Sequence, residues 1–144
     1  MLKPAGIQDL DQLVTLAAQL WPDHDVGALK AELADIIAQG ESQFFLIGDS
    51  GAPVGFAQCQ LRHDYVEGTS SSPVGYLEGI FVTPAARRRG CARALVAGCE
   101  AWAKAQGCTE LASDCSLDNR SSLRFHQALH FTEANRIICF TKAL

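Results

Sequence analysis

The segment from residue 74 to residue 115 constrains the fold of this chain more than any other part of the sequence. An apolar strand is expected at 74–82 and ends at Thr83-Pro84, and three arginines follow before Gly90 opens a helix. A second strand is expected at 110–115. A strand, helix and strand of this combined length form a right-handed crossover between parallel strands. The segment therefore predicts the α/β class, with at least two parallel strands in one sheet.

The preceding sequence predicts antiparallel strands beside this crossover. Residues 43–48 and 53–62 are expected to form a hairpin whose turn is Asp49-Ser50-Gly51. Because hairpin strands are antiparallel and crossover strands are parallel, we expect a mixed sheet with helices on both faces. No repeat or linker interrupts the sequence, so residues 1–144 are expected to form a single domain. The remaining expected elements are a strand at 2–4, helices at 9–20, 26–39 and 121–129, and closing strands at 132–136 and 137–141.

The composition is typical of a globular protein. Of the 144 residues, 48% are hydrophobic and 19% are charged, which suffices for a sizeable core. No apolar run approaches the roughly 20 residues that span a bilayer, and the first residues do not form a secretory signal. We therefore expect a cytoplasmic protein without membrane contact. The six cysteines lack metal-site spacing, so we expect no metal and mostly buried free thiols, with Cys91 and Cys115 the most exposed.

The distribution of charge indicates a local anion site. The formal net charge is −4, which argues against a nucleic-acid-binding protein, yet basic residues cluster at 87–93. At the start of a helix, unpaired backbone N–H groups and the helix dipole both favour an anion. A positive loop in an acidic chain therefore indicates one subsite for an anionic cofactor and another for a cationic substrate.

Two motifs resemble those of the GNAT N-acetyltransferases. Arg87-x-x-Gly90-x-Ala92 is similar to their pyrophosphate-binding loop, and Asn119-x-x-Ser122-x-x-Phe125-His126 is similar to their closing motif. The first motif lacks the Gly-Lys-Ser/Thr of a nucleotide P-loop. The resemblance implies the GNAT fold, a central mixed and splayed sheet flanked by helices, with acetyl-CoA as cosubstrate. The cofactor-binding residues that it implies are Ile80, Phe81, Val82, Arg87, Arg88, Arg89, Gly90, Cys91, Ala92, Arg93 and Asn119.

A narrower resemblance covers nearly the whole chain. The segments that carry it are Leu20-Trp21-Pro22, Arg62-His-Asp-Tyr65-Val-x-Gly68, Ser71-Ser-Pro-Val74, Leu77-Glu-Gly-Ile-Phe-Val82, Ala112-Ser-Asp114 and His126-Gln-Ala-Leu129. In this order they resemble the aminoglycoside 6'-N-acetyltransferases of type I. The resemblance implies acetylation of the 6'-amine of an aminoglycoside, and a homodimer in which the C-terminal strands exchange or cross the interface. The implied acceptor-site residues are Trp21, His24, Tyr65, Glu78 and Asp114, with Asn135 where relatives often carry a further acid.

Acetyl transfer to an amine assigns roles to the two carboxylates. The amine must lose a proton before it attacks the thioester directly, and Glu78 and Asp114 are expected to position and help deprotonate it. Counting by twos puts Glu78 on one face of its strand. The same face is expected to carry Tyr76, Ile80 and Val82. Asp114 ends a parallel strand, and ligands in open α/β sheets bind beyond such carboxyl ends.

Further roles concern the thioester and the cofactor arm. His126 stands at the position of a tyrosine that often serves as general acid in the family, so it is expected to protonate the departing thiol. A strand amide near Ile80 is expected to polarise the thioester carbonyl. A bulge in the strand 74–82 would open a gap to its parallel neighbour for the cofactor arm.

These assignments have structural alternatives. Glu78 could cap a loop, Asp114 could cap the next helix, and Trp21 and His126 could be packing residues. Two other functions are also open. One is a GNAT acetyltransferase that acts on a protein N-terminus, a lysine or a polyamine, and the other is a non-catalytic acyl-CoA sensor.

Overall fold

The computed structural model describes residues 1–49 and 51–144. The predicted turn Asp49-Ser50-Gly51 therefore rests on a residue, Ser50, that lies outside the described ones. The strands are β1 (Leu2–Ala5), β2 (Ser42–Ile47), β3 (Gly55–Arg62), β4 (Val74–Val82) and β5 (Leu111–Ala112). The α-helices are α1 (Leu10–Leu20), α2 (Val26–Gln39), α3 (Cys91–Ala105) and α4 (Arg120–Ala128), and the 3-10 turns are η1 (Ile7–Asp9) and η2 (Pro84–Ala86).

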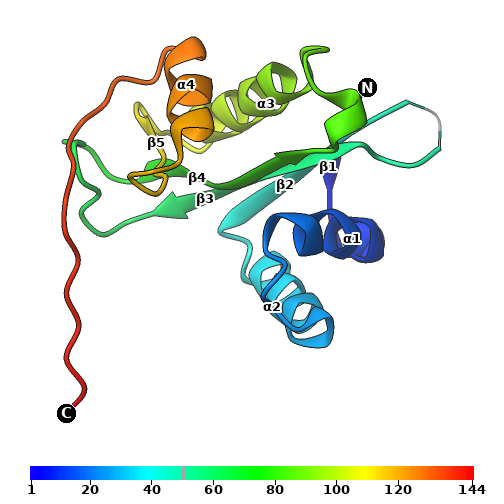
Figure 1. Ribbon diagram of the computed structural model, residues 1–144, viewed down its shortest axis with the longest axis horizontal. Coiled ribbons are helices and arrows are strands. Elements are labelled where there is room, and N and C mark those ends of the chain that lie inside the picture. The colour runs from blue at the N-terminus through cyan, green and yellow to red at the C-terminus, as the bar shows by residue number, and fades with distance from the viewer. Residues whose placement is uncertain (50) are drawn as a thin grey trace.

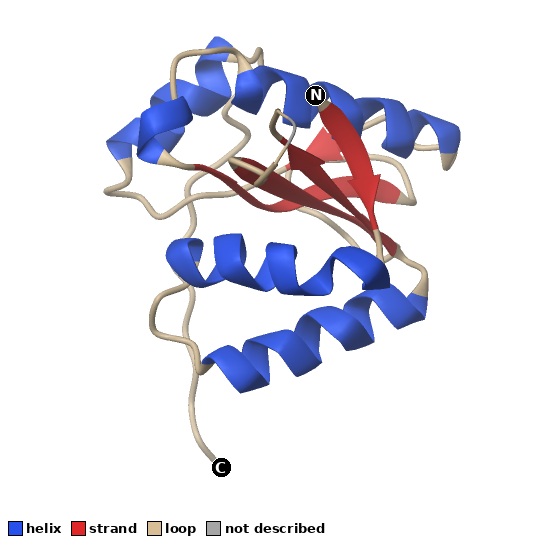
Figure 2. Ribbon diagram, turned by 90° about the vertical axis from the view of Figure 1, so that its right-hand side faces the viewer, coloured by secondary structure: helices blue, strands red, loops and turns tan. Residues whose placement is uncertain are grey.

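The five strands form one mixed sheet in the order β1-β2-β3-β4-β5. Neighbours from β1 to β4 are antiparallel, whereas β4 and β5 are parallel and connected through α3. Helices α1 and α2 cover one face of the sheet, and α3 and α4 cover the other (Figures 1 and 2). The predicted mixed sheet with helices on both faces is confirmed. Within residues 1–49 and 51–144, every helix falls short of the length and apolar character that a membrane crossing requires.

The connection between α1 and α2 shows how local sequence ends and starts the helices. Trp21 precedes a proline, which disfavours helical dihedrals, and its φ of −119° and ψ of 69° end α1. The Asp25 carboxylate then accepts a hydrogen bond from the Ala28 N–H at 2.9 Å and caps the first turn of α2. Gly40 ends α2 with a φ of +72°, a left-handed conformation that glycine adopts without steric cost.

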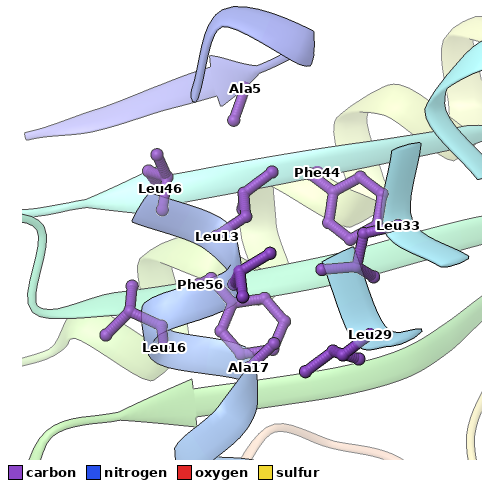
Figure 3. Close-up of a cluster of buried hydrophobic side chains, with 10 residues drawn as sticks. Ala5, Leu13, Leu16, Ala17, Leu29, Leu33, Phe44, Leu46 and Phe56 are labelled. Atoms are coloured by element: carbon purple, nitrogen blue, oxygen red, sulfur yellow. The ribbon is translucent and has the colours of Figure 1, made fainter. Parts of the chain in front are cut away.

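Two apolar cores lie on opposite faces of the sheet. The first packs α1 and α2 against the sheet, and Leu13, Phe44 and Phe56 are almost completely buried in it (Figure 3). The second packs α3 against the other face around Leu95 and Cys99. Because burying each such side chain contributes about 1.5–3 kcal/mol, the two cores hold the sheet firmly between its helix layers.

A β-bulge at Glu78 interrupts the pairing of β3 with β4. Gln58 of β3 pairs with Gly79, and the next residue, Cys59, pairs with Leu77. Glu78 therefore has no partner on β3, and it is the extra residue that defines the bulge. The predicted bulge in this strand is confirmed.

The bulge reverses the alternation of side chains along β4. Ile80 and Val82 pack into the α3 core, whereas Glu78 lines a cleft on the α2 side. The prediction that Glu78 shares a face with Ile80 and Val82 is therefore wrong. Counting by twos fails here because one additional residue shifts every later side chain to the opposite face.

The sheet opens between β4 and β5. In the described part of the chain, the parallel ladder consists of Gly75 with Leu111 and Tyr76 with Ala112. β5 is thus shorter than the predicted strand 110–115, because beyond Ala112 the chain leaves the ladder. From Leu77 onward β4 has no strand partner on the β5 side among the described residues, and the Leu77 carbonyl accepts only a side-chain hydrogen bond there, from the Ser113 hydroxyl at 3.4 Å. This is the splayed arrangement that the resemblance implied.

The predicted closing strands at 132–136 and 137–141 do not form in this chain. The segment from Thr132 to Leu144 has neither helix nor strand, and it extends away from the sheet (red in Figure 1). A strand needs a partner, and the neighbouring edge strand β5 has only 2 residues. As a result Ile138 and Phe140 are 80% and 87% exposed, and Cys139 is exposed where a buried thiol was predicted.

Candidate active site

The loop between β4 and α3 presents free backbone donors and arginines at the start of a helix. Gly90 precedes α3 with a φ of +82°, and Arg88 is also left-handed, with a φ of +62°. The Ala94 N–H donates to the Gly90 carbonyl at 3.0 Å. The N–H groups of residues 91–93 come before this bond and have no acceptor within the helix. These donors and the positive end of the helix dipole favour a bound anion, as the sequence predicted.

A cleft of about 590 Å³, here named the arginine cleft, lies over this helix start. Its lining residues are Gln19, Leu20, Ile80, Phe81, Val82, Ala86, Arg87, Arg88, Gly90, Cys91, Ala92, Arg93, Asn119, Ser121, Ser122 and Phe125. The structure thus brings together all the predicted cofactor residues except Arg89, which is exposed outside the lining. The Arg87 Nε–H donates to the Val82 carbonyl at 3.0 Å, which ties the loop to the end of β4, and the residue is exposed.

The arginine cleft fits a long ligand that carries a diphosphate and amide groups. Guanidinium groups and free N–H donors at the start of α3 suit the diphosphate. Between Glu78 and Phe81 the edge of β4 lacks a neighbouring strand on the β5 side among the described residues, so it offers backbone donors and acceptors to amides that run along it. Asn119 caps α4 by accepting from the Ser122 N–H at 3.1 Å, so its side-chain N–H groups stay available to a ligand. Acetyl-CoA has this sequence of groups.

A second cleft of about 740 Å³, here named the Glu78 cleft, lies on the α2 side of the sheet. Its lining residues are Trp21, His24, Leu29, Glu32, Leu33, Ile36, Gln39, Glu41, Gln58, Gln60, Leu61, Arg62, His63, Asp64, Tyr65 and Glu78. Four of the predicted acceptor-site residues, Trp21, His24, Tyr65 and Glu78, meet there. Asp114 and Asn135 are not in this lining.

Trp21 has both a packing role and a place in the Glu78 cleft. Its ring meets Phe56 edge-on at 6.0 Å between centroids and is partly buried against the α1–α2 core. It also lies against Gly79, where an added Cβ would come within 2.8 Å of the indole. The functional and structural readings of Trp21 are therefore compatible, because one side of the ring packs and the residue still lines the cleft.

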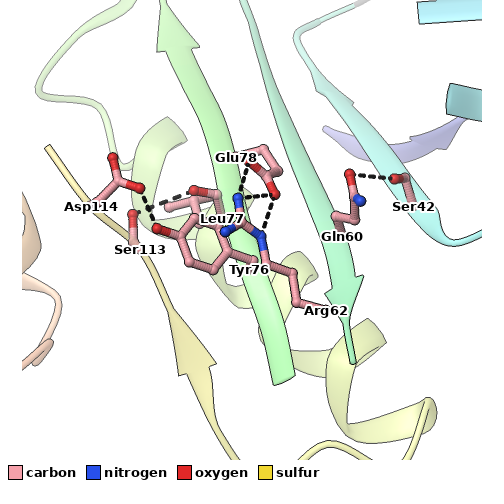
Figure 4. Close-up of polar contacts among 8 residues, drawn as sticks. All are labelled: Ser42, Gln60, Arg62, Tyr76, Leu77, Glu78, Ser113 and Asp114. Atoms are coloured by element: carbon pink, nitrogen blue, oxygen red, sulfur yellow. Dashed lines mark hydrogen bonds and ion pairs between the residues drawn. The ribbon is translucent and has the colours of Figure 1, made fainter. Parts of the chain in front are cut away.

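The Glu78 carboxylate is held by a side chain that the sequence reasoning had not assigned to the site. The Arg62 Nε–H and one terminal N–H donate to Glu78 Oε1 at 2.9 and 2.7 Å, and the same terminal nitrogen donates to Oε2 at 3.0 Å (Figure 4). The Arg62 Cζ atom lies 3.5 Å from the centroid of the Tyr76 ring. Arg62 stands at the end of β3, opposite Val74, and the bulge turns Glu78 to the same side.

Asp114 also has a hydrogen-bond partner, Tyr76, whose ring lies under Arg62. The Tyr76 hydroxyl donates to Asp114 Oδ2, so Tyr76 joins the ring under Arg62 to the second carboxylate (Figure 4). Burial and this hydrogen bond raise the pKa of the Tyr76 phenol above its ordinary value of 10.0. Asn135 is exposed elsewhere, where its amide donates to Glu67 Oε1 at 2.9 Å. Tyr76 was missed because its contact is with a residue 38 positions later in the chain, just beyond the end of β5.

The contacts of His126 restrict its protonation. Its Nδ1 lies 2.7 Å from the Ser122 carbonyl, which can only accept, so Nδ1 carries a proton. Its Nε2 lies 2.8 Å from the Ser113 hydroxyl. In the neutral ring Nε2 is therefore an acceptor, and only the imidazolium form can donate from it. His126 also meets Phe125 and Phe131 edge-on, both at 5.1 Å between centroids.

The described linings of the two clefts share no residue, but they contain neighbouring residues at the end of α1 and beside the bulge of β4. Leu20 and Ile80 line the arginine cleft, whereas Trp21 and Glu78 line the Glu78 cleft. Among the described residues, His, Cys, Asp and Glu side chains form no group of three or more that could hold a metal ion.

Comparison with known proteins agrees with this geometry. The sequence model of the acetyltransferase (GNAT) family matches residues 8–131. The aminoglycoside N(6')-acetyltransferase type 1 of Salmonella typhimurium is 44% identical over 133 residues, which cover 92% of each chain. The protein of the same name from Acinetobacter baumannii is 41% identical over 142 residues, covering 98% of this chain and 97% of the relative.

Solved structures give the same result for the fold. The aminoglycoside acetyltransferase AAC(6')-Iy in complex with the bisubstrate analogue CoA-S-monomethyl-acetylneamine superposes with a TM-score of 0.95 at 40% identity. The superposition covers 100% of this chain and 98% of that one. AAC(6')-Ih from Acinetobacter baumannii superposes with a TM-score of 0.93 at 39% identity, covering 100% and 98%. The predicted splayed mixed sheet is thus confirmed as the fold of these enzymes.

Proposed function

The chain belongs to the acetyltransferase (GNAT) family, and from this we propose that it transfers an acetyl group from acetyl-CoA to the 6'-amine of aminoglycosides. The observation that carries the proposal is that an arginine-lined cleft and a carboxylate-containing cleft are lined by neighbouring residues of β4 at and beside its bulge. Relatives named aminoglycoside N(6')-acetyltransferase type 1 at 41–44% identity support the substrate class.

In this proposal the arginine cleft holds acetyl-CoA, which supplies the acetyl group as a thioester. Arg87, Arg88 and Arg93, with the free N–H groups at the start of α3, bind the diphosphate. Asn119 and the open edge of β4 bind the amides of the cofactor arm. A backbone N–H near Ile80 polarises the thioester carbonyl, because this part of β4 is free of a parallel neighbour.

The Glu78 cleft receives the aminoglycoside. Several ammonium groups on sugar rings bind best beside carboxylates and aromatic faces, which Glu78, Trp21 and Tyr65 provide. Glu78 and Asp114 position the 6'-ammonium and help to deprotonate it, so that the neutral amine attacks the acetyl carbon directly. As the C–S bond breaks, the nitrogen loses its second proton to solvent and becomes an amide. His126 in its imidazolium form donates a proton to the leaving thiolate, through the Ser113 hydroxyl that it contacts.

The product explains a resistance function. Acetylation of the 6'-amine removes one positive charge and changes the hydrogen-bonding group at that position. Because charged amines contribute strongly to binding of phosphate-rich RNA, the modified drug binds the ribosome less tightly.

One experiment separates this proposal from the alternative acceptors. The protein is incubated with acetyl-CoA and pairs of aminoglycosides that differ only in a 6'-amine or a 6'-hydroxyl, and acetyl addition is read by mass. We expect addition to the amine and none to the hydroxyl. Asp114→Ala should lower turnover by more than ~10-fold. Turnover of a polyamine or a peptide but of no aminoglycoside would favour the other acceptors, and coenzyme A binding without any turnover would favour a sensor.

We also propose that two copies form a homodimer through their C-terminal segments. Residues 132–144 leave the sheet without a partner strand, and Ile137, Ile138 and Phe140 are more than half exposed. Pairing with a second copy would satisfy the backbone and cover these side chains. Light scattering should give twice the mass of one chain, and Phe140→Glu should give a monomer. A monomeric wild-type protein would refute the dimer.

We also propose that the protein is cytoplasmic, because the six cysteines of the chain are free thiols.

A further inference from the structure

We propose that Arg62 is a positioning residue for acetyl transfer, which sets the orientation of the Glu78 carboxylate and links it to Asp114. The inference rests on the proposed function, and it adds to the proposed active site a residue, Arg62, that does not itself react. It starts from the bulge, where Glu78 lacks a partner on β3. At such a residue the backbone ladder constrains the side chain less than elsewhere, so side-chain contacts decide where the carboxylate lies.

Arg62 makes those contacts on both carboxylate oxygens. Three N–H···O distances of 2.7 to 3.0 Å join the guanidinium to Oε1 and Oε2 of Glu78. A planar guanidinium bound to both oxygens fixes the plane of the carboxylate as well as its position. Because a carboxylate has about four lone-pair positions, one position on Oε2 stays available to an acceptor amine or a water.

The guanidinium is itself held in place. It stacks on the Tyr76 ring at 3.5 Å, and Tyr76 is buried to 7% exposure and donates to Asp114. Glu78, Arg62, Tyr76 and Asp114 thus form one connected chain across β3, β4 and the segment that follows β5 (Figure 4). The side chain of Arg62 is 40% exposed and that of Glu78 22%, so the pair borders the cleft and remains within reach of a substrate.

This geometry also makes Arg62 more than a surface charge. A lysine would keep the charge but could not bind both oxygens from a plane or stack as a plane on Tyr76. A displacement of about 1 Å in a positioned group can lower a rate by roughly 100-fold. We therefore expect Arg62→Gln to lower kcat by about 10- to 100-fold and Arg62→Lys by about 10-fold, with a smaller change in the KM for the aminoglycoside.

The test is a double-mutant cycle with steady-state kinetics. Arg62→Gln, Glu78→Gln and the double variant are compared with Arg124→Gln, which removes the same charge from an exposed position of α4 that lines neither cleft. If Arg62 acts through Glu78, the double variant should be no more than ~3-fold slower than Glu78→Gln alone. Arg124→Gln should keep the wild-type rate.

Three results would overturn the inference. They are a kcat for Arg62→Gln within about twofold of wild type, losses that multiply in the double variant, and a change confined to KM. A cooperative thermal unfolding transition shows that each variant is folded. The affinity for coenzyme A should be unchanged in Arg62→Gln, because Arg62 lies outside the arginine cleft. Absence of aminoglycoside turnover in the wild-type protein would instead refute the proposed function, before any variant is compared.

Discussion

Replacing Gly90 by alanine should weaken coenzyme A binding through backbone strain alone. Gly90 is left-handed with a φ of +82°, and a Cβ built there meets no atom within 4 Å. The cost is therefore conformational, about 1–2 kcal/mol for an L-residue in this region. The alanine also restricts the unfolded chain, which offsets about 0.4–1 kcal/mol. The free energy of unfolding should fall by roughly 0.5–1.5 kcal/mol.

The affinity of Gly90→Ala for coenzyme A should fall because the backbone strain can relax in the free protein but not in the complex. In the free protein the loop can move away from the left-handed geometry, and the binding of coenzyme A then has to restore it. Restoring 1–2 kcal/mol corresponds to a Kd that rises by up to about 5- to 30-fold. Calorimetric titration with coenzyme A measures this change, and urea unfolding measures the stability.

The same helix provides a matched control. Gly107, just beyond the C-terminal end of α3, has a φ of +89° and also offers open space to a Cβ. Gly107→Ala should cost the same stability but leave the Kd of coenzyme A within about twofold of wild type. An unchanged Kd in Gly90→Ala, or equal changes in both variants, would refute the assignment of the diphosphate to the start of α3.

Two other predictions concern titration. The Lys3 ammonium donates to Asp9 and, with the Gly6 N–H, holds the pKa of this buried carboxyl below its ordinary 3.8. Asp9 thus stabilises the fold above about pH 4 and loses this effect as the pH falls through the lowered pKa, so Asp9→Asn should cost about 1–3 kcal/mol at pH 7 and progressively less in acid. If the free energies of unfolding of Asp9→Asn and wild type differed by the same amount at every pH, this prediction would be contradicted. Burial and the hydrogen bond to Asp114 raise the pKa of the Tyr76 phenol, so Tyr76 should stay protonated up to about pH 11 and Tyr76→Phe should leave the phenolate absorbance up to that pH unchanged. A loss of absorbance in Tyr76→Phe would show that Tyr76 ionises in the folded state.

Most of the local structure could be predicted from the sequence because its signals are local. The helical periodicity of 9–20 and 26–39, the break at Trp21-Pro22 and the glycine before α3 each depend on neighbouring residues. The motif around the arginines likewise placed most of the residues of the arginine cleft, because they follow one another along β4, the loop and α3.

The errors arose where a distant segment decides the outcome. The faces of β4 depend on a bulge against β3, which adds one residue to the count at Glu78. The closing strands failed because a strand forms only against a partner, and β5 ends at Ala112. The sequence of β4 alone does not reveal the bulge, and the sequence of 132–141 alone does not reveal that its partner strand is too short.

The amino-acid sequence alone thus determined the class of fold and the arginine-rich start of α3, since both follow from short-range pattern, and its resemblance to known acetyltransferases indicated the residue types that an acetyl transfer requires. Only the tertiary structure decided how the carboxylates are held. Arg62 meets Glu78 across 16 residues and Tyr76 meets Asp114 across 38, so the register of β3, β4 and β5 had to form before either pair existed. Strand register is a property of the whole sheet, and it is this register that gives the site its geometry.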